Sequence, residues 1–582
     1  MSRVPDENTP FLNQEEIDES EIISIIQQRR LSIASVGTDH IPPPSSFNPL
    51  THSTSHSHLN SPFGNYGGVG APRSRRGSEG LGLAPWKSTN SLDLSAVISN
   101  SNLPQEPETD YKTEFKVLLS YSIPLSITFL LQYSLTVASV FSVGRLGSEE
   151  LAAVSLSSMT ANISGYAIIQ GISTCLDTLC AQSFGRKDYN MVGMHFMRCN
   201  YLLLMLFVPI FVLWFFLSND ILVFLIGEDQ LKICHLASTY LKILCMGLPG
   251  FILFENAKHY LQSQGVFHAS TYVLTICAPI NIILNYTLVW DKRIGMGFVG
   301  APLSVVITNW IMCIMLYGYI YFVNGYQCWP KFGIFDMKYF KHWQRMINLS
   351  IPGVLMVEAE WLAFEIITFT ASQFGTDTLA AQSIVSTTCV IFYQIPFAMS
   401  IAASTRIAWF IGSASKKAAK ISSNATILLS LVVGSINGVV LFTCRGLFAS
   451  LYSSDNQVIK LASKVLIVGA VYQLNDALAC LTAGILRGQG RQKIGGWLNL
   501  ISYYLLALPL AFYLAFAGDL KLLGLWMGML IALFILSMSQ LYFVISSDWD
   551  GIIKDCIDES LLDNMTIDSH SVVPSMSSGH LG

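Results

Sequence analysis

The chain has 582 residues, of which 52% are apolar and only 12% are charged. A soluble protein of this length would carry about twice that share of charge to cover its surface. The composition therefore indicates an integral membrane protein that lies in a lipid bilayer, and the net charge of −4 argues against a nucleic-acid partner.

Residues 1–115 are polar and rich in Ser, Pro, Gly and Asn. A segment of this kind buries too little apolar surface to fold, so we expect a disordered N-terminal tail. Within it, Arg29-Arg30-Leu31-Ser32 and Arg75-Arg76-Gly77-Ser78 look like kinase sites. Ser32 and Ser78 are therefore candidate phosphorylation sites.

Residues 116–546 form a hydrophobic body that divides into apolar runs of about 20 residues, the length that crosses a bilayer as a helix. The runs are centred near residues 130, 163, 206, 245, 277, 310, 360, 394, 431, 472, 505 and 534. We therefore predict an all-α, polytopic membrane protein with twelve transmembrane helices.

The even number of spans places both tails on the same side of the membrane. The loops after even-numbered spans hold about twice as many Lys and Arg residues as the loops after odd-numbered spans. The positive-inside rule then predicts that both tails are cytoplasmic. The sequence does not choose between the vacuolar membrane and the plasma membrane.

The two halves of the body resemble each other. At an offset of 228, Ser122-Ile123-Pro124 falls on Ser350-Ile351-Pro352, and Gly147 falls on Gly375. A duplicated unit of six spans predicts two lobes related by a pseudo-twofold axis along the membrane normal, with the substrate bound between them.

The predicted parts follow from this repeat. They are an N-terminal tail (1–115), an N-lobe (116–329), a cytoplasmic linker (330–345), a C-lobe (346–546) and a cytoplasmic C-terminal tail (547–582).

Carboxyl groups occur inside the second half of the body, with Glu358, Glu360 and Glu365 in span 7 and Asp476 in span 10. A charge inside a membrane span is costly, so such residues are functional candidates. A carboxyl group in a low-dielectric cavity favours its neutral form, which lets it bind and release a proton in each cycle. We predict Glu360, Glu365 and Asp476 as the ion-coupling and substrate-binding site.

The first half is neutral at the equivalent place, because the offset of 228 aligns Gln132 with Glu360. Its own acids, Asp177 and Glu255, lie near the cytoplasmic ends of spans 2 and 4. We expect Asp177 to bond to the turn before Gly185, and Glu255 to pair with Lys258 or His259.

Aromatic faces attract organic cations, and several aromatic residues lie near the acids in the sequence or on other spans. Together with two glutamines they are candidates for lining a substrate cavity: Gln132, Trp361, Phe364, Gln382, Tyr393 and Tyr472.

Catalytic motifs are missing from the sequence. It holds no GxxxxGK[ST] loop for ATP and no HExxH or GxSxG. The twelve cysteines form no CxxC or Cys/His cluster, so we expect neither disulfides nor a metal site. We predict a transporter rather than an enzyme, with no cofactor.

Several stretches resemble the MATE family (multidrug and toxic compound extrusion) in its eukaryotic branch, over about residues 112–546, and the extended N-tail looks fungal. The stretches are Glu360-Trp361-Leu362-Ala363-Phe364-Glu365, Ala381-Gln382-Ser383-Ile384, Leu176-Asp177-Thr178-Leu179-Cys180-Ala181-Gln182, Asp476-Ala477-Leu478-Ala479 and Gly484-Ile485-Leu486-Arg487-Gly488-Gln489-Gly490.

The resemblance implies a V-shaped pair of six-helix lobes that exports organic cations and other small molecules in exchange for protons or sodium. Glu360, Glu365 and Asp476 match the acids of eukaryotic members. Ser139 stands where some prokaryotic members have Asp, so the resemblance gives no support for an ion site in the first lobe. Ser386-Thr387 replaces a Glu of mammalian members, so the substrate range is expected to differ.

These observations favour a monomeric, proton-coupled exporter of organic cations, xenobiotics or metabolites. Three alternatives stay open: a sodium-coupled exporter of the same fold, a flippase for lipid-linked substrates, and a membrane scaffold that transports nothing. The acidic charges of the second lobe disfavour a flippase, which needs a cationic cavity for phosphate groups.

Overall fold

The computed structural model describes residues 109–568, apart from residues 145, 228, 229, 332 and 334. These residues belong to one compact unit. Within the described ranges every element is a helix. Ser32 and Ser78 lie outside the described residues.

The first half of the body begins with a long helix, and its elements are α3 (Tyr111–Val143), α4 (Ser148–Ala161), η1 (Asn162–Tyr166), α5 (Ala167–Ser173), α6 (Cys175–Gly185), α7 (Tyr189–Val212), η2 (Leu213–Leu217), α8 (Ser218–Ile226), α9 (Leu231–Leu244), η4 (Cys245–Gly247), α10 (Leu248–Ser263), α11 (His268–Trp290), η5 (Gly297–Val299), α12 (Gly300–Phe322), η6 (Tyr326–Cys328) and η7 (Met337–Phe340).

The second half follows the same plan and adds one helix at its end. Its elements are α13 (Gln344–Ser372), α14 (Thr376–Gly412), α15 (Lys416–Tyr452), α16 (Asn456–Gly488), α17 (Gln492–Leu500), η8 (Ile501–Ala507), α18 (Leu508–Phe512), η9 (Tyr513–Ala517), α19 (Lys521–Ile545) and α20 (Trp549–Asp568).

Ten helical stretches in the described part of the chain are long and apolar enough to cross a membrane, judged by length and composition. The other two predicted spans, α4–α6 and α13, are also helical but more polar, and α13 carries three glutamates. Each of the twelve predicted centres falls inside a helix. The twelve-helix prediction is therefore confirmed.

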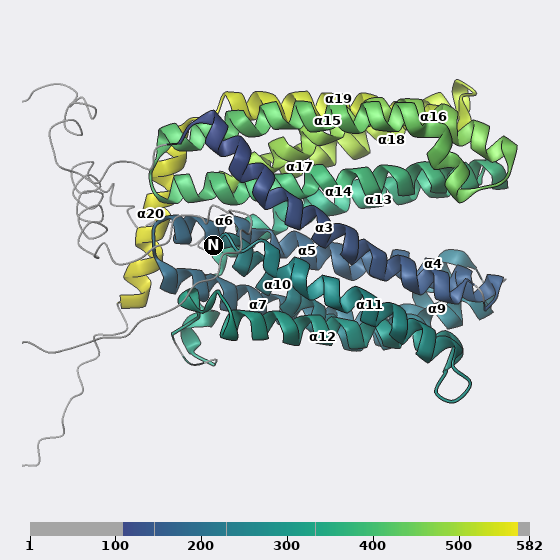
Figure 1. The fold of residues 1–582 in the computed structure, drawn as a ribbon, viewed down its shortest axis with the longest axis horizontal. Helices are drawn as coiled ribbons and strands as arrows, with labels where there is room; N and C mark the ends of the chain where they lie inside the picture. Colours follow the sequence, from purple (N-terminus) through teal and green to yellow (C-terminus); the bar gives the residue numbers. More distant parts are fainter. Residues whose placement is uncertain (1–108, 145, 228–229, 332, 334, 569–582) are drawn as a thin grey trace, which may run out of the picture. The chain divides into compact units, whose positions relative to one another are not determined.

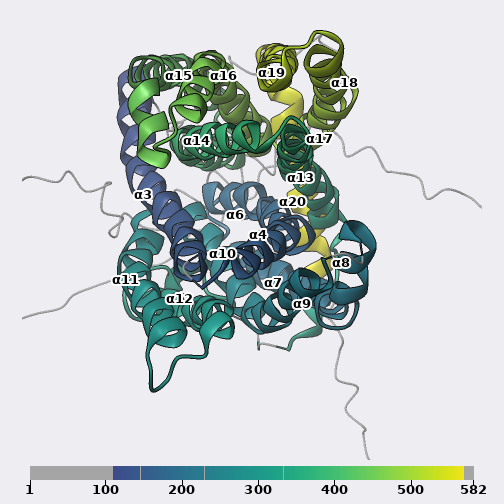
Figure 2. The ribbon, with the colours of Figure 1, turned by 90° about the vertical axis from the view of Figure 1, so that its right-hand side faces the viewer.

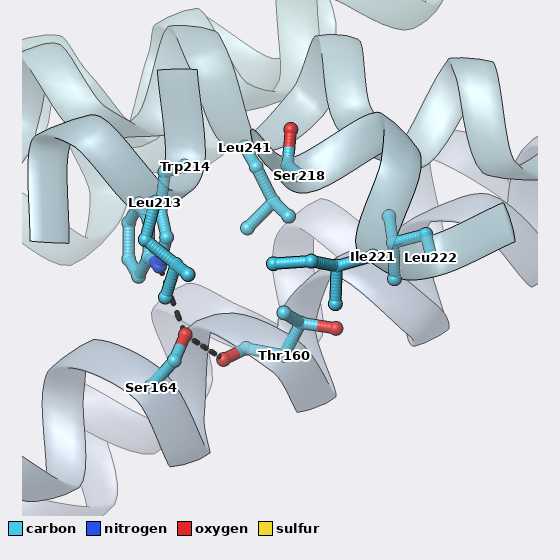
Figure 3. A pocket seen from close by; sticks show the side chains of 8 residues that line it. All are labelled: Thr160, Ser164, Leu213, Trp214, Ser218, Ile221, Leu222 and Leu241. Carbon is cyan, nitrogen blue, oxygen red and sulfur yellow. Dashed lines mark hydrogen bonds between the residues drawn. The ribbon is translucent and has the colours of Figure 1, made fainter. Parts of the chain in front are cut away.

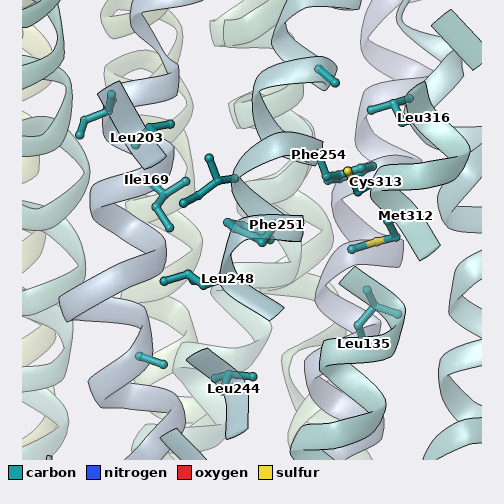
Figure 4. Packing of buried hydrophobic residues seen from close by; sticks show 14 of the residues in the cluster. Leu135, Ile169, Leu203, Leu244, Leu248, Phe251, Phe254, Met312, Cys313 and Leu316 are labelled. Carbon is teal, nitrogen blue, oxygen red and sulfur yellow. The ribbon is translucent and has the colours of Figure 1, made fainter. Parts of the chain in front are cut away.

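The helices form two groups, seen end-on in Figure 2, with α4–α12 in the N-lobe and α13–α19 in the C-lobe. Each lobe has its own apolar core. The N-lobe core gathers side chains such as Ile169, Phe254 and Leu316 (Figure 4). The C-lobe core gathers residues between Ala359 and Leu536. Because nearly all of each core comes from its own half of the chain, the lobes are distinct packing units.

The internal repeat is visible in the backbone at helix ends. Gly265 after α10 and Gly490 after α16 both have left-handed φ angles, of 81° and 75°. Glycine is favoured there because a Cβ atom would clash with the backbone. Gly147 and Gly375 likewise cap the starts of α4 and α14. The two halves thus share turns as well as helices.

The first helix of each half reaches across to the other lobe (Figures 1 and 2). On α3, Leu118 packs with Met399 of α14. On α13, Met346 and Leu349 join the N-lobe core. The predicted tail boundary at residue 115 falls inside α3, because Asp110 caps this helix by accepting a hydrogen bond from Thr113 N at 3.0 Å.

We call the end of the body that carries the start of α3, the α6–α7 turn and α20 the tail end (Figure 1). The lobes touch here through polar contacts. The Trp409 indole donates to the Ser263 carbonyl at 2.7 Å, and Thr178 Oγ1 donates to the Arg487 carbonyl at 2.6 Å. Arg406 donates two hydrogen bonds to the buried carboxylate of Glu114.

The last described helix, α20, lies across the tail end (Figure 1). Its apolar side chains Trp549, Ile552 and Ile553 pack into a small core made with α14, α15, α16 and α19. Its partners lie on both lobes, since Cys556 contacts Arg186 and Gln182 of the N-lobe while Asp550 pairs with Lys416 of the C-lobe. The sequence analysis did not foresee this helix.

Candidate functional site

The three glutamates of span 7 lie on α13, which continues through Pro352. All three side chains are partly buried. Glu358 and Glu365 are seven residues apart and share a face, whereas Glu360 and Glu365 are about 140° apart around the helix. The helix therefore presents its acids in two directions.

Asp476 lies on α16, the central helix of the C-lobe, which packs against α14, α15 and α19. Its side chain is only 4% exposed. It lies near enough to Glu360 for the two carboxyl groups to interact electrostatically. Among the described residues, no basic side chain forms an ion pair with Glu360, Glu365 or Asp476.

Three tyrosines interact with this pair of acids. Tyr393, Tyr472 and Tyr503 each interact electrostatically with both Glu360 and Asp476. The tyrosines come from α14, α16 and η8, and Glu360 comes from α13. Four elements of the C-lobe therefore contribute to this group. The result is a cluster of two carboxyl groups and three phenol rings, which we call the acid cluster.

Phe364 supports one side of the acid cluster. Its ring lies 6.1 Å from the Tyr472 ring and 6.0 Å from the Trp526 ring, measured between centroids. Tyr472 and Trp526 are also in edge contact, at 5.6 Å. Trp526 was missed by the sequence analysis, because nothing in its neighbourhood on α19 distinguishes it from a packing residue.

Gln382 has a positioning role in this arrangement. It is fully buried, and its amide nitrogen donates to Thr368 at 3.1 Å and to Ser386 at 2.9 Å. Its oxygen accepts from the Trp526 indole at 2.7 Å. The side chain thus joins α13, α14 and α19 and has no polar atom left to face a cavity.

The other candidates of span 7 show no contact with the pair among the described residues. Glu365 and Trp361 are partly buried, and no hydrogen bond or ring contact of theirs is present among the described residues. Glu358 interacts electrostatically with Tyr504. The structure therefore brings Glu360 and Asp476 together, and among the described residues it shows no such interaction for Glu365.

The equivalent place in the N-lobe has a different composition. Gln132 of α3 donates to Glu255 Oε1 at 2.8 Å, and Lys258 pairs with Glu255 Oε2 at 2.5 Å. Glu255 and Lys258, both on α10, are 0% and 2% exposed. The predicted pairing of Glu255 with Lys258 is confirmed.

Asp177 does not bond to the turn before Gly185, so that prediction was wrong. Its carboxylate bonds instead to His259 Nδ1 at 2.6 Å and to the Arg487 guanidinium at 3.4 Å. Arg487 belongs to the C-lobe, 310 positions away, and such a partner cannot be read from local sequence. Asp177 is therefore part of the contact between the lobes.

A small cavity of about 110 Å³ lies elsewhere in the N-lobe (Figure 3). The π-helical turns η1 and η2 contribute to its wall, where the Trp214 indole donates to Ser164 at 2.9 Å. Its lining residues are Thr160, Ser164, Leu213, Trp214, Ser218, Ile221, Leu222 and Leu241. None of them is a predicted site residue.

Comparisons with known proteins agree with the duplicated body. A family model described as MatE matches the chain twice, over residues 124–287 and 352–513. The two matches begin at Pro124 and Pro352, which the repeat had aligned.

Relatives and a solved structure cover the same region. "Uncharacterized transporter YDR338C" of Saccharomyces cerevisiae is 44% identical over 442 residues, which is 76% of this chain and 63% of that relative. "Multidrug and toxin extrusion protein 2" of Mus musculus is 30% identical over 447 residues, 76% of each chain. The eukaryotic MATE transporter AtDTX14 superposes with a TM-score of 0.70 at 24% identity, covering 77% of this chain and 98% of its own.

Proposed function

Because the chain belongs to the MatE family of transporters, we propose that it is a secondary active antiporter that exports organic cations or other small molecules in exchange for protons. It is an integral, multi-pass membrane protein and not an enzyme. The acid cluster carries the proposal, since two neighbouring carboxyl groups have no basic partner in the described part of the chain.

The chemistry of the acid cluster suits exchange. A buried carboxylate beside a partly buried one is repelled by it and loses hydration, so the pair is favoured when it holds a proton or a cation. An organic cation is also attracted to the rings of Tyr393 and Tyr472. Proton and substrate therefore compete for one place, as antiport requires.

In the proposed cycle, a proton enters from the acidic side and binds at Glu360 or Asp476, which weakens the hold on the cation. The cation leaves, the lobes rock about the site, and loss of the proton on the other side restores the binding state. One pH unit supplies about 1.4 kcal/mol per proton, and 100 mV about 2.3 kcal/mol per charge. A modest gradient thus sustains roughly tenfold to hundredfold accumulation.

The test is Glu360→Gln in proteoliposomes with an imposed pH gradient and a fluorescent organic cation. We expect loss of proton-driven uptake to less than about one tenth of the wild-type rate, since one carboxyl of the pair is gone. Asp377→Asn is the matched control, because Asp377 is an exposed acid at the start of α14. Wild-type uptake by Glu360→Gln would rule out the assignment.

Two alternatives are separated by the same preparation. Sodium could occupy the same carboxylates, so varying pH and sodium independently decides which ion drives uptake. A scaffold would show no counterflow of a labelled cation. A flippase for lipid-linked phosphates is disfavoured, because the charges in the acid cluster are negative.

We further propose that both tails are cytoplasmic and that the chain works as a monomer. The basic residues Arg186, Lys187, Lys416 and Lys417 follow α6 and begin α15, both at the tail end, which supports the sidedness through the positive-inside rule. Both lobes come from one chain, which supports the monomer. Protease accessibility of the tails in sealed vesicles tests the first point, and light scattering of the purified protein tests the second.

A further inference from the structure

The N-lobe holds a buried ion pair for which the transport cycle has no use. Glu255 and Lys258 lie one turn apart on α10, with an N–O distance of 2.5 Å and almost no exposure. Gln132 completes the group by donating to Glu255 at 2.8 Å. Lys258 also lies over the ring of Phe129, 5.1 Å from its centroid. We call Gln132, Glu255 and Lys258 the neutral cluster.

The neutral cluster lies on the first and fourth spans of the N-lobe, as Glu360 and Asp476 lie on the first and fourth spans of the C-lobe. Gln132 on span 1 aligns with Glu360 on span 7, and α10 and α16 end in equivalent turns at Gly265 and Gly490. Each lobe therefore sets a polar residue of its first span against an acid of its fourth span. The N-lobe adds Lys258, whereas no basic residue pairs with the acid cluster in the described part of the chain.

Aromatic rings link the two clusters. Phe129 contacts Phe397 at 4.9 Å between centroids, and Phe397 stacks on Tyr393 at 5.6 Å. Tyr393 belongs to the acid cluster. Since Lys258 lies over Phe129, a continuous row of three rings connects the clusters.

We propose that Lys258 is a built-in counter-ion, which fills the N-lobe cation site permanently and so confines ion coupling to the C-lobe. A fully buried carboxylate without a partner must take up a proton or a cation. The Lys258 ammonium supplies that charge from within the helix, so Glu255 has nothing to exchange. The charges of Glu255 and Lys258 cancel, and the amide of Gln132 is neutral, so the cluster has zero net charge. A second acid in place of Gln132 would make the cluster negative.

The proposal predicts that removing the lysine charge creates a second titratable site. The variant is Lys258→Met, which keeps the apolar stem, and the matched variant is Lys258→Met combined with Glu255→Gln. Both are made in a background of Glu360→Gln and Asp476→Asn, so that the acid cluster contributes no signal. Infrared difference spectra between acid and alkaline pH report protonated carboxyl groups directly.

We expect Lys258→Met to gain one protonated-carboxyl band, and the added Glu255→Gln to remove it. No new band in a folded Lys258→Met protein, or a band that persists after Glu255→Gln, would overturn the proposal. This measurement needs no transport, so it stands even where the proposed proton antiport fails its own test.

Transport gives a second measurement that rests on the proposed function. With the acid cluster intact, Lys258→Met should move one more proton per substrate, which at a gradient of one pH unit raises the accumulation ratio about tenfold. The charge-neutral pair of Glu255→Gln and Lys258→Met should keep the wild-type ratio. If Lys258→Met alone does not fold, the double variant decides the question. Loss of proton-driven uptake in the double variant would overturn the proposal.

Discussion

At the scale of single residues, the closeness of Glu360 and Asp476 has a measurable consequence. Because the two carboxyl groups interact, we expect them to bind a proton as one unit. Glu360→Gln and Asp476→Asn should each remove proton-driven uptake, and the double variant should lose no more than either single one. A double-mutant cycle on uptake rates should give a coupling energy of about 0.5–3 kcal/mol. Additive losses would mean that the two acids act independently.

A second prediction concerns the thiols. Eleven of the twelve cysteines are buried and Cys444 is half-buried. Cys328 ends the short helix η6 after α12, outside the spans, and burial raises its pKa to about 12. A raised pKa favours the unreactive thiol, so at pH 8 very little of the reactive thiolate is present there.

We therefore expect mass spectrometry after brief maleimide treatment at pH 8 to find Cys444 labelled first and Cys328 unlabelled. Unfolding the protein in detergent and denaturant removes the burial and should make Cys328 label as fast as Cys444. Fast labelling of Cys328 in the folded protein would contradict its burial.

The sequence predicts which acids lie in the membrane spans, but it does not predict which of them lie close together in the fold. Glu360, Glu365 and Asp476 are charged residues in apolar runs, a contrast that needs no structure to notice. Which of them meet depends on how α13 and α16 are rotated in the packed lobe. That rotation is set by contacts such as Phe364 with Trp526, between residues distant in sequence.

At the scale of helices, the contact between α5 and α13 depends on two glycines. A Cβ atom at Gly171 would lie 2.5 Å from the Val354 Cα, and one at Gly353 would overlap the Gly171 carbonyl oxygen. Gly353→Ala should therefore separate the two helices and cost about 1–3 kcal/mol, seen as a lower unfolding temperature in detergent. Gly446→Ala on α15, where nothing lies within 4 Å, should cause no such loss. Equal stability of the two variants would show that α5 and α13 are not closely packed.

Helix positions followed from apolar runs because a span must satisfy its backbone within itself. The turns at Gly147 and Gly375 followed from the repeat. The helix α20 did not, because it is only twenty residues of mixed polarity, and its order comes from packing Trp549, Ile552 and Ile553 against four other helices, α14, α15, α16 and α19. The local sequence shows that a helix is amphipathic, but it does not show which surface its apolar face packs against.

At the scale of the whole molecule, Asp177 joins the lobes at the tail end. Asp177→Asn leaves the buried Arg487 without its carboxylate, and breaking a buried pair of this kind costs about 3–5 kcal/mol. We expect the lobes to separate at the tail end, seen as a longer distance between spin labels at the exposed positions Lys187 and Lys417. Glu149→Gln breaks only the exposed pair with Lys232 and should leave that distance unchanged. An unchanged distance in Asp177→Asn would mean that other contacts hold the lobes together.

The position of α20 has a consequence for how the protein is made. A chain is synthesised from its N-terminus, and domains fold as they emerge from the ribosome. The helix α20 follows every membrane span, and its partners Arg186 and Lys416 lie on different lobes. It can therefore complete its contacts only after both lobes are inserted and beside each other. Trp549, Ile552 and Ile553 are covered by the C-lobe alone, whereas Cys556 gains its partners Arg186 and Gln182 only when the N-lobe is in place. A half-assembled chain therefore differs from a finished one by unmade polar contacts at the tail end.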